Sequence, residues 1–133
     1  MKAPLLTLAA VLVLASCQTA PPPLATDSPT EVYFQRAQAA SDQGQYDEAL
    51  AIYQLFLTNQ PKADAESTFS ARYEIALLQE KKGHRTEAMA GYQSLIDDFG
   101  NLDKSAGAPA WVKVLAQKKL QELQDQGPKP KTP

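Results

Sequence analysis

Apolar residues between positions 29 and 126 recur with the period of an α-helix. Residues 46–59 give the clearest case, because their apolar positions fall at +3, +4, +7, +10 and +11 from the first, on one face of a helix with about 3.6 residues per turn. These positions are Tyr46, Ala49, Leu50, Tyr53, Phe56 and Leu57. Similar patterns predict helices over 29–43, 65–82, 86–99 and 109–126, and no strand is predicted. The sequence therefore indicates an all-α domain.

The residues at the ends of these segments are typical of helix boundaries. Ser28 is expected to cap the first helix, with Pro29 at its first position and Glu31 closing a capping box. Gly44 is expected to end that helix in the left-handed conformation that glycine adopts readily. Residues 101–108 are predicted to form a loop. The remaining helix ends are predicted at Pro61, Gly83, Gly100 and Gly127–Pro128.

The segment 65–82 carries two apolar stripes, whereas an ordinary surface helix carries one. The first stripe is Phe69, Tyr73, Ala76 and Leu77, and the second is Ala71, Ile75 and Leu78. So wide an apolar surface needs packing partners on two sides. This segment is therefore predicted to be the central helix of the domain.

The first seventeen residues have the organisation of a bacterial signal sequence. Lys2 precedes the ten-residue apolar run Leu5–Leu14, which spans roughly 15 Å as a helix, half of a ~30 Å hydrocarbon core. The following residues, Leu14-Ala15-Ser16-Cys17, resemble a lipobox: an aliphatic residue, two small residues and a cysteine. This resemblance implies that residues 1–16 are a cleaved signal peptide and that Cys17 is lipidated. The alternative is an ordinary secretory signal with an incidental cysteine.

The chain after Cys17 is expected to begin with a spacer. Residues 17–27 contain three consecutive prolines, which favour a polyproline II conformation of about 3.1 Å per residue, so ten residues reach roughly 30 Å. Acyl chains on Cys17 would anchor the protein without a spanning helix. Because Gln18 replaces the aspartate that retains enterobacterial lipoproteins at the inner membrane, we expect an outer-membrane, periplasm-facing protein. The helical domain is predicted over 28–126 and a disordered tail over 127–133.

Composition narrows the chemistry that the chain can perform. The 133 residues carry a formal net charge of −2, which gives no basic footprint for nucleic acid. The single Cys and single His are too few for an internal disulfide or a zinc site. No nucleophile lies beside a base in the sequence. We therefore expect no catalytic residue, no metal and no cofactor, and we do not expect an enzyme.

An internal repeat narrows the fold. Residues 44–53 and residues 83–92 share Gly, Glu, Ala, Ala and Tyr in register, 39 residues apart, and Ala37 and Ala76 match at the same offset. This pattern resembles the tetratricopeptide repeat, in which small residues let paired helices approach closely and glycine makes the turn. The resemblance implies a right-handed stack of two helical hairpins plus one C-terminal capping helix.

The repeats also depart from the usual pattern. The 39-residue period exceeds the common 34, Gly100 replaces the closing proline, and Phe56 and Leu95 stand where a small residue is common. Longer repeats with bulky residues at these positions are similar in style to those of bacterial envelope lipoproteins. Examples are the tetratricopeptide lipoprotein of the β-barrel assembly machine and the Tol–Pal coordinator protein.

The resemblance also implies a concave groove lined by the first helix of each hairpin. The matching positions are Phe34, Gln38, Ser41 and Asp42 in the first repeat and Tyr73, Leu77, Glu80 and Lys81 in the second. Phe34 and Tyr73 would be aromatic anchors for a peptide or partner helix. The alternative is that Tyr73 and Leu77 pack on neighbouring helices. Trp111 is expected to cap the open end of the stack or to form an exposed contact.

Three functions remain open at this point. The first is a membrane-tethered adaptor that binds an envelope protein or peptide through the groove. The second is a lipoprotein that binds a small ligand or an envelope polymer in a pocket between the first, third and fifth helices, as an accessory of solute uptake. The third is a structural component that self-associates through the open end of a stack of only two repeats.

Overall fold

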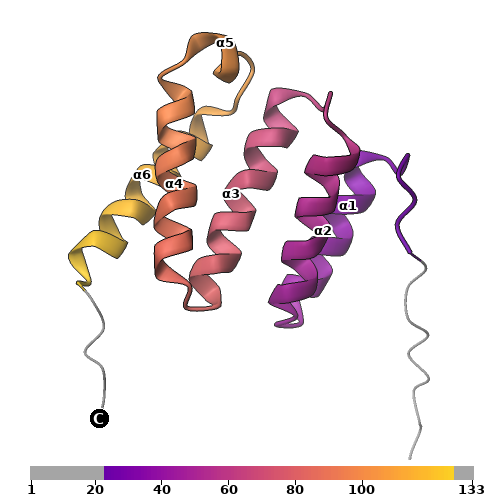
Figure 1. Ribbon diagram of the computed structural model, residues 1–133, viewed down its shortest axis with the longest axis horizontal. Coiled ribbons are helices and arrows are strands. Elements are labelled where there is room, and N and C mark those ends of the chain that lie inside the picture. The colour runs from indigo at the N-terminus through magenta and orange to yellow at the C-terminus, as the bar shows by residue number, and fades with distance from the viewer. Residues whose placement is uncertain (1–22, 128–133) are drawn as a thin grey trace, which may run out of the picture.

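The computed structural model describes residues 23–127, and every regular element in this range is an α-helix (Figure 1). The all-α prediction is confirmed, and each predicted helix is present with ends displaced by no more than one residue. The helices are α1 (Thr30–Asp42), α2 (Tyr46–Asn59), α3 (Ala65–Lys81), α4 (Arg85–Phe99), α5 (Leu102–Ser105) and α6 (Ala110–Asp125).

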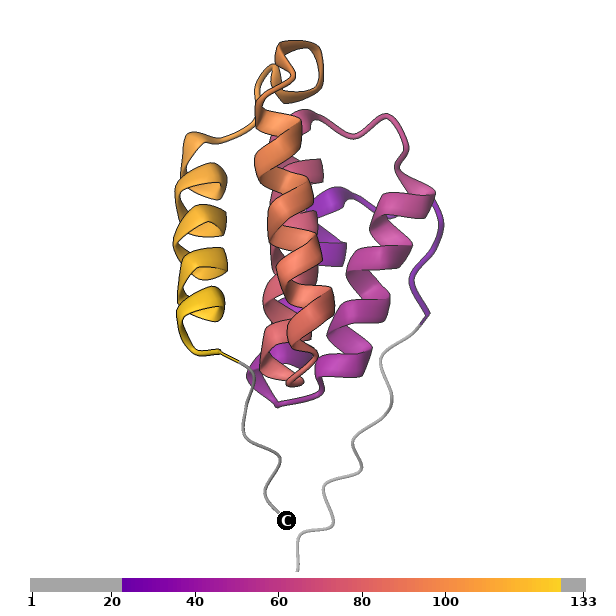
Figure 2. The ribbon, with the colours of Figure 1, turned by 60° about the vertical axis from the view of Figure 1, so that its left-hand side comes forward.

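The helices form a stack of two antiparallel hairpins followed by one further long helix. Helices α1 and α2 make the first hairpin, α3 and α4 make the second, and α6 packs against α4 and α3 (Figure 1). Figure 2 shows α6 running beside α4 at one end of the stack, with α2 at the other end. This arrangement is the tetratricopeptide-like stack that the sequence predicted.

Helix α3 is the central element, as its two apolar stripes predicted. Phe69, Tyr73 and Ala76 are buried in a C-terminal core, which they share with α4 and α6. Ala71 and Leu78 are buried in an N-terminal core, which they share with α1 and α2. The single helix therefore joins the two hairpins into one folded body.

Small residues set the spacing of the paired helices. Ala37 and Ala49 are fully buried in the first hairpin, and Ala76 and Ala88 are buried at equivalent places in the second. A β-carbon added at Gly91 would lie 2.9 Å from the Ala76 β-carbon, so α3 and α4 approach each other too closely at that glycine to leave room for a side chain. Gly44 has a φ of 75°, which confirms its predicted left-handed conformation, and Gly83, with a φ of 79°, adopts the same conformation in the second repeat.

The N-terminal boundary differs from the prediction. Pro29 occupies the cap position of α1 without a side-chain cap hydrogen bond, so the predicted Ser28 capping box is wrong. Instead, the Gln60 side-chain amide donates hydrogen bonds to the carbonyls of Thr26 (3.4 Å) and Ser28 (3.2 Å). Leu24 also packs against the N-terminal core. The folded domain therefore includes residues 24–27, which belong to the segment predicted as a spacer.

The segment predicted as a loop contains the one-turn helix α5. The Asn101 side-chain oxygen accepts hydrogen bonds from the backbone N–H groups of Asp103 (3.1 Å) and Lys104 (3.3 Å). These bonds satisfy backbone N–H groups that the start of a helix leaves without a partner. A single helical turn therefore forms in a segment whose sequence has no helical pattern of apolar residues.

Several predictions fall outside the described residues. These are the signal peptide over 1–16, the lipidation of Cys17, the spacer up to residue 22 and the tail from residue 128. Within residues 23–127, no helix is both long enough and apolar enough to cross a bilayer. The same described part of the chain holds no group of three or more acidic, His or Cys side chains placed to bind a metal ion.

Candidate partner-binding groove

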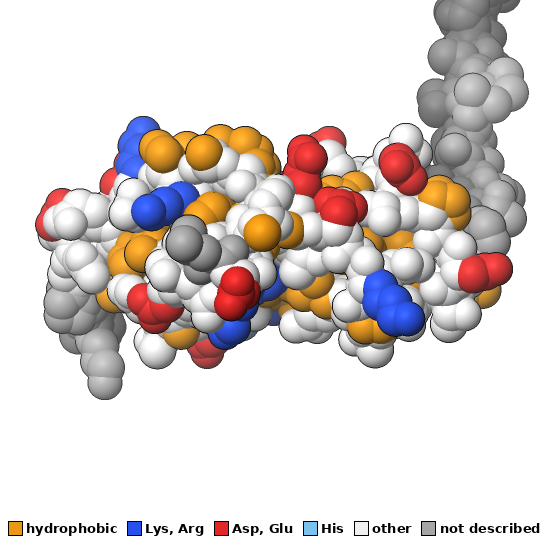
Figure 3. Space-filling view, turned by 90° about the horizontal axis from the view of Figure 1, so that it is seen from above, with side chains coloured by type: hydrophobic (Ala, Val, Ile, Leu, Met, Phe, Trp, Pro, Cys, Tyr) orange, Lys and Arg blue, Asp and Glu red, His pale blue; other side chains and the backbone are white. Residues whose placement is uncertain are grey.

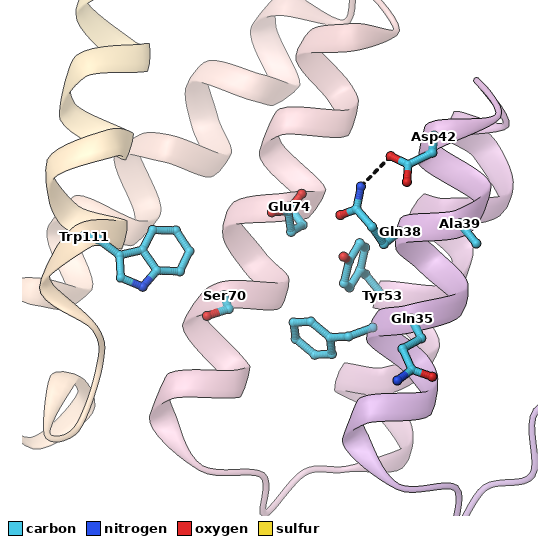
Figure 4. Close-up of a pocket in the computed structure, with 9 residues that line it drawn as sticks. Gln35, Gln38, Ala39, Asp42, Tyr53, Ser70, Glu74 and Trp111 are labelled. Carbon is cyan, nitrogen blue, oxygen red and sulfur yellow. Dashed lines mark hydrogen bonds between the residues drawn. The ribbon is translucent and has the colours of Figure 1, made fainter.

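A groove of about 600 Å³ runs along the face of the stack where α1 and α3 lie next to each other. Helix α1 supplies most of its wall, α3 supplies Ser70 and Glu74, and α6 contributes Trp111 (Figure 4). The remaining lining residues are Phe34, Gln35, Gln38, Ala39 and Asp42 from α1 and Tyr53 from α2. The first helices of both repeats therefore meet in one concave surface.

Aromatic rings form the apolar part of the groove. The Phe34 ring stands edge-on to the rings of Tyr53 and Phe56, with centroids 5.3 Å apart in each case. The position of Phe34 is thus fixed by the N-terminal core behind it. Across α3, Trp111 is 44% exposed. The groove therefore presents a rigid aromatic wall on α1 and an accessible indole on α6.

Carboxylates supply the polar part of the groove. The Asp42 carboxylate accepts a hydrogen bond of 2.7 Å from the Gln38 side chain, which holds both residues along α1 (Figure 4). Burial raises the pKa of Glu74, although the charge of Lys81 acts in the opposite direction. Burial also raises the pKa of the Tyr53 phenol, and the charges of Glu74 and Asp42 add to this shift. Asp42 and Glu74 therefore make the polar part of the lining acidic, and the raised pKa keeps the Tyr53 hydroxyl protonated at neutral pH.

The groove continues toward the ends at which α1 and α3 begin. A second hollow of about 300 Å³ shares Phe34 and Ser70 with the first and adds Glu31 and Glu66. Figure 3 looks down on this end of the molecule and shows acidic side chains among apolar ones. Among the described residues that line either hollow, none is lysine or arginine.

Three of the predicted groove residues on α1 line the groove: Phe34, Gln38 and Asp42. Ser41 lies beside it and accepts a hydrogen bond of 3.2 Å from the Lys81 ammonium group. That ammonium group also lies 5.6 Å from the centroid of the Tyr46 ring. Ser41 and Lys81 therefore tie the first hairpin to α3 next to the groove.

The predicted positions on α3 need correction, because three of them pack toward α4 and α6 and the fourth, Lys81, reaches the first hairpin beside the groove. Tyr73 is only 6% exposed and packs against Tyr92 and Trp111. Leu77 packs against the C-terminal core. Glu80 accepts hydrogen bonds from the Tyr92 hydroxyl (2.9 Å) and the Lys119 ammonium (3.0 Å). The groove lining contains none of Tyr73, Leu77, Glu80 and Lys81. Tyr73 and Leu77 instead pack on neighbouring helices, which was the alternative interpretation of these two residues.

The sequence analysis missed Glu74, and it expected Trp111 as a cap or an exposed contact without placing it in the groove. Glu74 lies between the two apolar stripes of α3, so a helical projection of that segment could have pointed to it. Helix α6 likewise carries a second apolar stripe, Trp111, Val114 and Leu115, beside the buried one. Val114 is 61% exposed, which agrees with the expectation that Trp111 forms an exposed contact.

Comparison with known families agrees with this geometry. Residues 30–62 match a family model of the tetratricopeptide repeat, and residues 70–101 match a second model of the same repeat. The first match spans α1 and α2, and the second spans most of α3 and all of α4. The chain therefore carries two tetratricopeptide repeats, and neither match is to an enzyme family. The search of curated proteins and the search of solved structures each found no significant match.

Proposed function

We propose that this protein is a membrane-tethered adaptor of the bacterial envelope that binds a segment of another protein in the groove between α1 and α3. The observation that carries this proposal is the groove itself, in which Phe34 and Trp111 offer aromatic surface beside Glu74. Tetratricopeptide repeats are general protein-binding modules, and aromatic side chains at the centre of a concave face supply most of the energy of such contacts.

The membrane part of the proposal comes from the sequence alone. Lys2, the apolar run Leu5–Leu14 and the lipobox-like residues before Cys17 support a lipid anchor, and Gln18 supports the outer membrane. Two or three acyl chains hold a protein on a bilayer stably, whereas one chain holds it only marginally. The proline-rich residues that follow would let the helical domain face the periplasm.

The anchor is tested by metabolic labelling with palmitate and by fractionation of envelopes. The wild-type chain should incorporate label and sediment with outer membranes. The Cys17→Ser variant should lose the label and keep its uncleaved leader. Labelling of the variant, or a wild-type chain found free in the periplasm, would contradict the lipoprotein assignment.

The groove is tested by photo-crosslinking in intact cells. A photoreactive phenylalanine analogue replaces Gln38, which lies in the groove, and in a matched chain it replaces Gln54, which is exposed on α2 outside the lining. We expect one discrete protein adduct from position 38 and none from position 54. Equal adducts from both positions, or none from position 38, would contradict binding in the groove.

Self-association is the second candidate, and the exposed stripe on α6 favours it. Trp111, Val114 and Leu115 together leave apolar surface open at the end of the stack. Sedimentation equilibrium of the full chain in detergent measures this directly. A mass that rises with protein concentration, and that Val114→Lys keeps at the monomer value, would favour the structural role over the adaptor.

A further inference from the structure

The groove between α1 and α3 combines aromatic rings with carboxylates in one continuous lining. Glu74 and Asp42 lie in the larger hollow, and Glu31 and Glu66 lie in the smaller one. Phe34 is common to both hollows, so the carboxylates are placed on either side of an apolar ring. The carboxylates therefore lie along an extended hollow and not in one isolated acidic patch.

We propose that the segment bound in this groove is cationic, a stretch of a partner protein that carries lysine or arginine side chains beside apolar ones. This inference rests on the proposed adaptor function, because it names the chemical class of partner for the same groove. Charge complementarity carries it: carboxylates line the groove from end to end, and no lysine or arginine is among the described lining residues.

Glu74 is the carboxylate on which the cationic preference chiefly depends. Its side chain is half-buried between α1 and α6 (Figure 4), and within residues 23–127 its carboxylate forms no hydrogen bond and no ion pair. The other acid of the larger hollow, Asp42, already accepts a hydrogen bond from Gln38. A partly buried carboxylate without such a partner is stabilised by an approaching cation far more than an exposed one is.

The aromatic lining selects the same class of side chain. Arginine and lysine have long apolar stems that lie along hydrophobic surface, and their charged groups are attracted to the faces of aromatic rings. Phe34 and Tyr53 line the groove near Glu74, and Trp111 reaches it from the other side of α3. An acidic partner segment would instead be repelled by all four carboxylates.

Lys81 is the cation whose charge acts on Glu74, and it limits where the segment can sit. Its ammonium group is held by Ser41 and by the ring of Tyr46, beside the groove and outside its lining. Its charge favours the ionised form of Glu74 from a distance. The bound cation is therefore expected on the Ser70 side of Glu74, where the two hollows join.

The test is a selection of random dodecapeptides displayed on phage against the full chain in detergent micelles. We expect lysine and arginine to be enriched above the input library. The enrichment should fall with Glu74→Gln and persist with Glu87→Gln, a matched change of an exposed acid at the start of α4. Replacing the basic residue of the leading peptide by glutamine should weaken its binding about tenfold in fluorescence polarisation at low salt.

The possible results separate this inference from the adaptor function. Peptides enriched without basic residues, peptides enriched in acids, or no enrichment at all would overturn the cationic preference. The crosslink from position 38 decides the adaptor function independently. An adduct together with a pool lacking basic residues would leave the adaptor standing and remove only this inference. Basic enrichment without an adduct would support the inference and count against the adaptor.

Discussion

The indole ring of Trp111 stands edge-on to the phenol ring of Tyr73, with the centroids 5.6 Å apart and the ring planes at 84°. Tyr73 belongs to the core, and Trp111 covers it while leaving 44% of its own surface exposed. The two residues of this pair therefore have different roles, since Tyr73 stabilises the fold and Trp111 lies on the concave face. The buried Tyr73 ring packs α3 against α6, and the Trp111 ring lines the groove.

The two rings should therefore respond differently to truncation. Tyr73→Ala removes a buried aromatic ring and should lower the free energy of unfolding by about 3 kcal/mol. Trp111→Ala should cost about 1 kcal/mol of stability but weaken binding of the partner segment about tenfold. Urea denaturation and fluorescence polarisation measure the two effects. Equal losses of stability in both variants would contradict the division of roles.

Replacing Gly91 by alanine should lower stability, although the same change usually raises it in a helix. Inside an exposed helix, Gly→Ala gains about 1 kcal/mol of stability. Here the new methyl group would lie 2.9 Å from the Ala76 β-carbon, so Gly91→Ala should instead cost about 1–2 kcal/mol by forcing α3 and α4 apart.

The neighbouring Ala90 is the control for this prediction, because it is exposed on the same helix. Ala90→Gly should lower stability by about 1 kcal/mol through helix propensity alone. Adding Ala76→Gly to the Gly91→Ala variant should recover part of the loss. A Gly91→Ala variant more stable than the wild type would show that the two helices do not approach as closely as described.

Glu74→Gln should uncouple stability from binding. Burial in the folded state raises the pKa of Glu74. The protonated side chain therefore contributes to stability below the ordinary pKa of glutamate. This contribution is lost as the pH rises through the raised pKa. At neutral pH the variant should therefore be at least as stable as the wild type while binding the cationic segment more weakly. Unfolding curves between pH 4 and pH 8 test this. A variant less stable than the wild type at pH 7 would contradict the assignment.

Tyr33 should anchor the segment that precedes α1. Its hydroxyl donates to the Ala25 carbonyl at 2.9 Å and accepts from the Asn59 side chain at 2.9 Å. Tyr33→Phe removes both bonds and should lower stability by about 1–2 kcal/mol.

Tyr53→Phe is the matched change, since no hydrogen bond of the Tyr53 hydroxyl is found within residues 23–127, and it should alter stability little. Hydrogen exchange should also show faster opening of residues 24–28 in the Tyr33 variant alone. If exchange there is the same in both variants, the hydrogen bonds do not hold the segment.

The repeating part of the fold could be predicted from sequence because it is encoded locally. Tyr46–Leu57 shows a clean helical period, and Gly44 and Gly83 mark turns that only a residue tolerant of positive φ makes cheaply. The position of α3 followed from its two stripes. Helix α5 could not be predicted in this way, because a side-chain cap from Asn101 starts it and no apolar period marks the segment in the sequence.

The groove was only half predictable, because the two repeats have different neighbours. Helix α1 has one other first helix beside it, whereas α3 lies between α1 and α6. The groove positions were counted from Ala37 in α1 and, at the same spacings, from Ala76 in α3. In α3 these spacings lead to residues that face α6, such as Tyr73 and Glu80. Which side of α3 stays open depends on how α6 packs, and that is a tertiary contact that no local pattern records.

The most direct test of the groove is an NMR titration of the full chain with the peptide segment identified by the crosslink. We expect the largest shift changes on Phe34, Gln38, Ser70, Glu74 and the indole N–H of Trp111. The outward residues of α2 and α4, such as Gln54 and Glu87, should stay unchanged. Changes concentrated on α2 and α4, with a silent Trp111 indole, would contradict binding between α1 and α3.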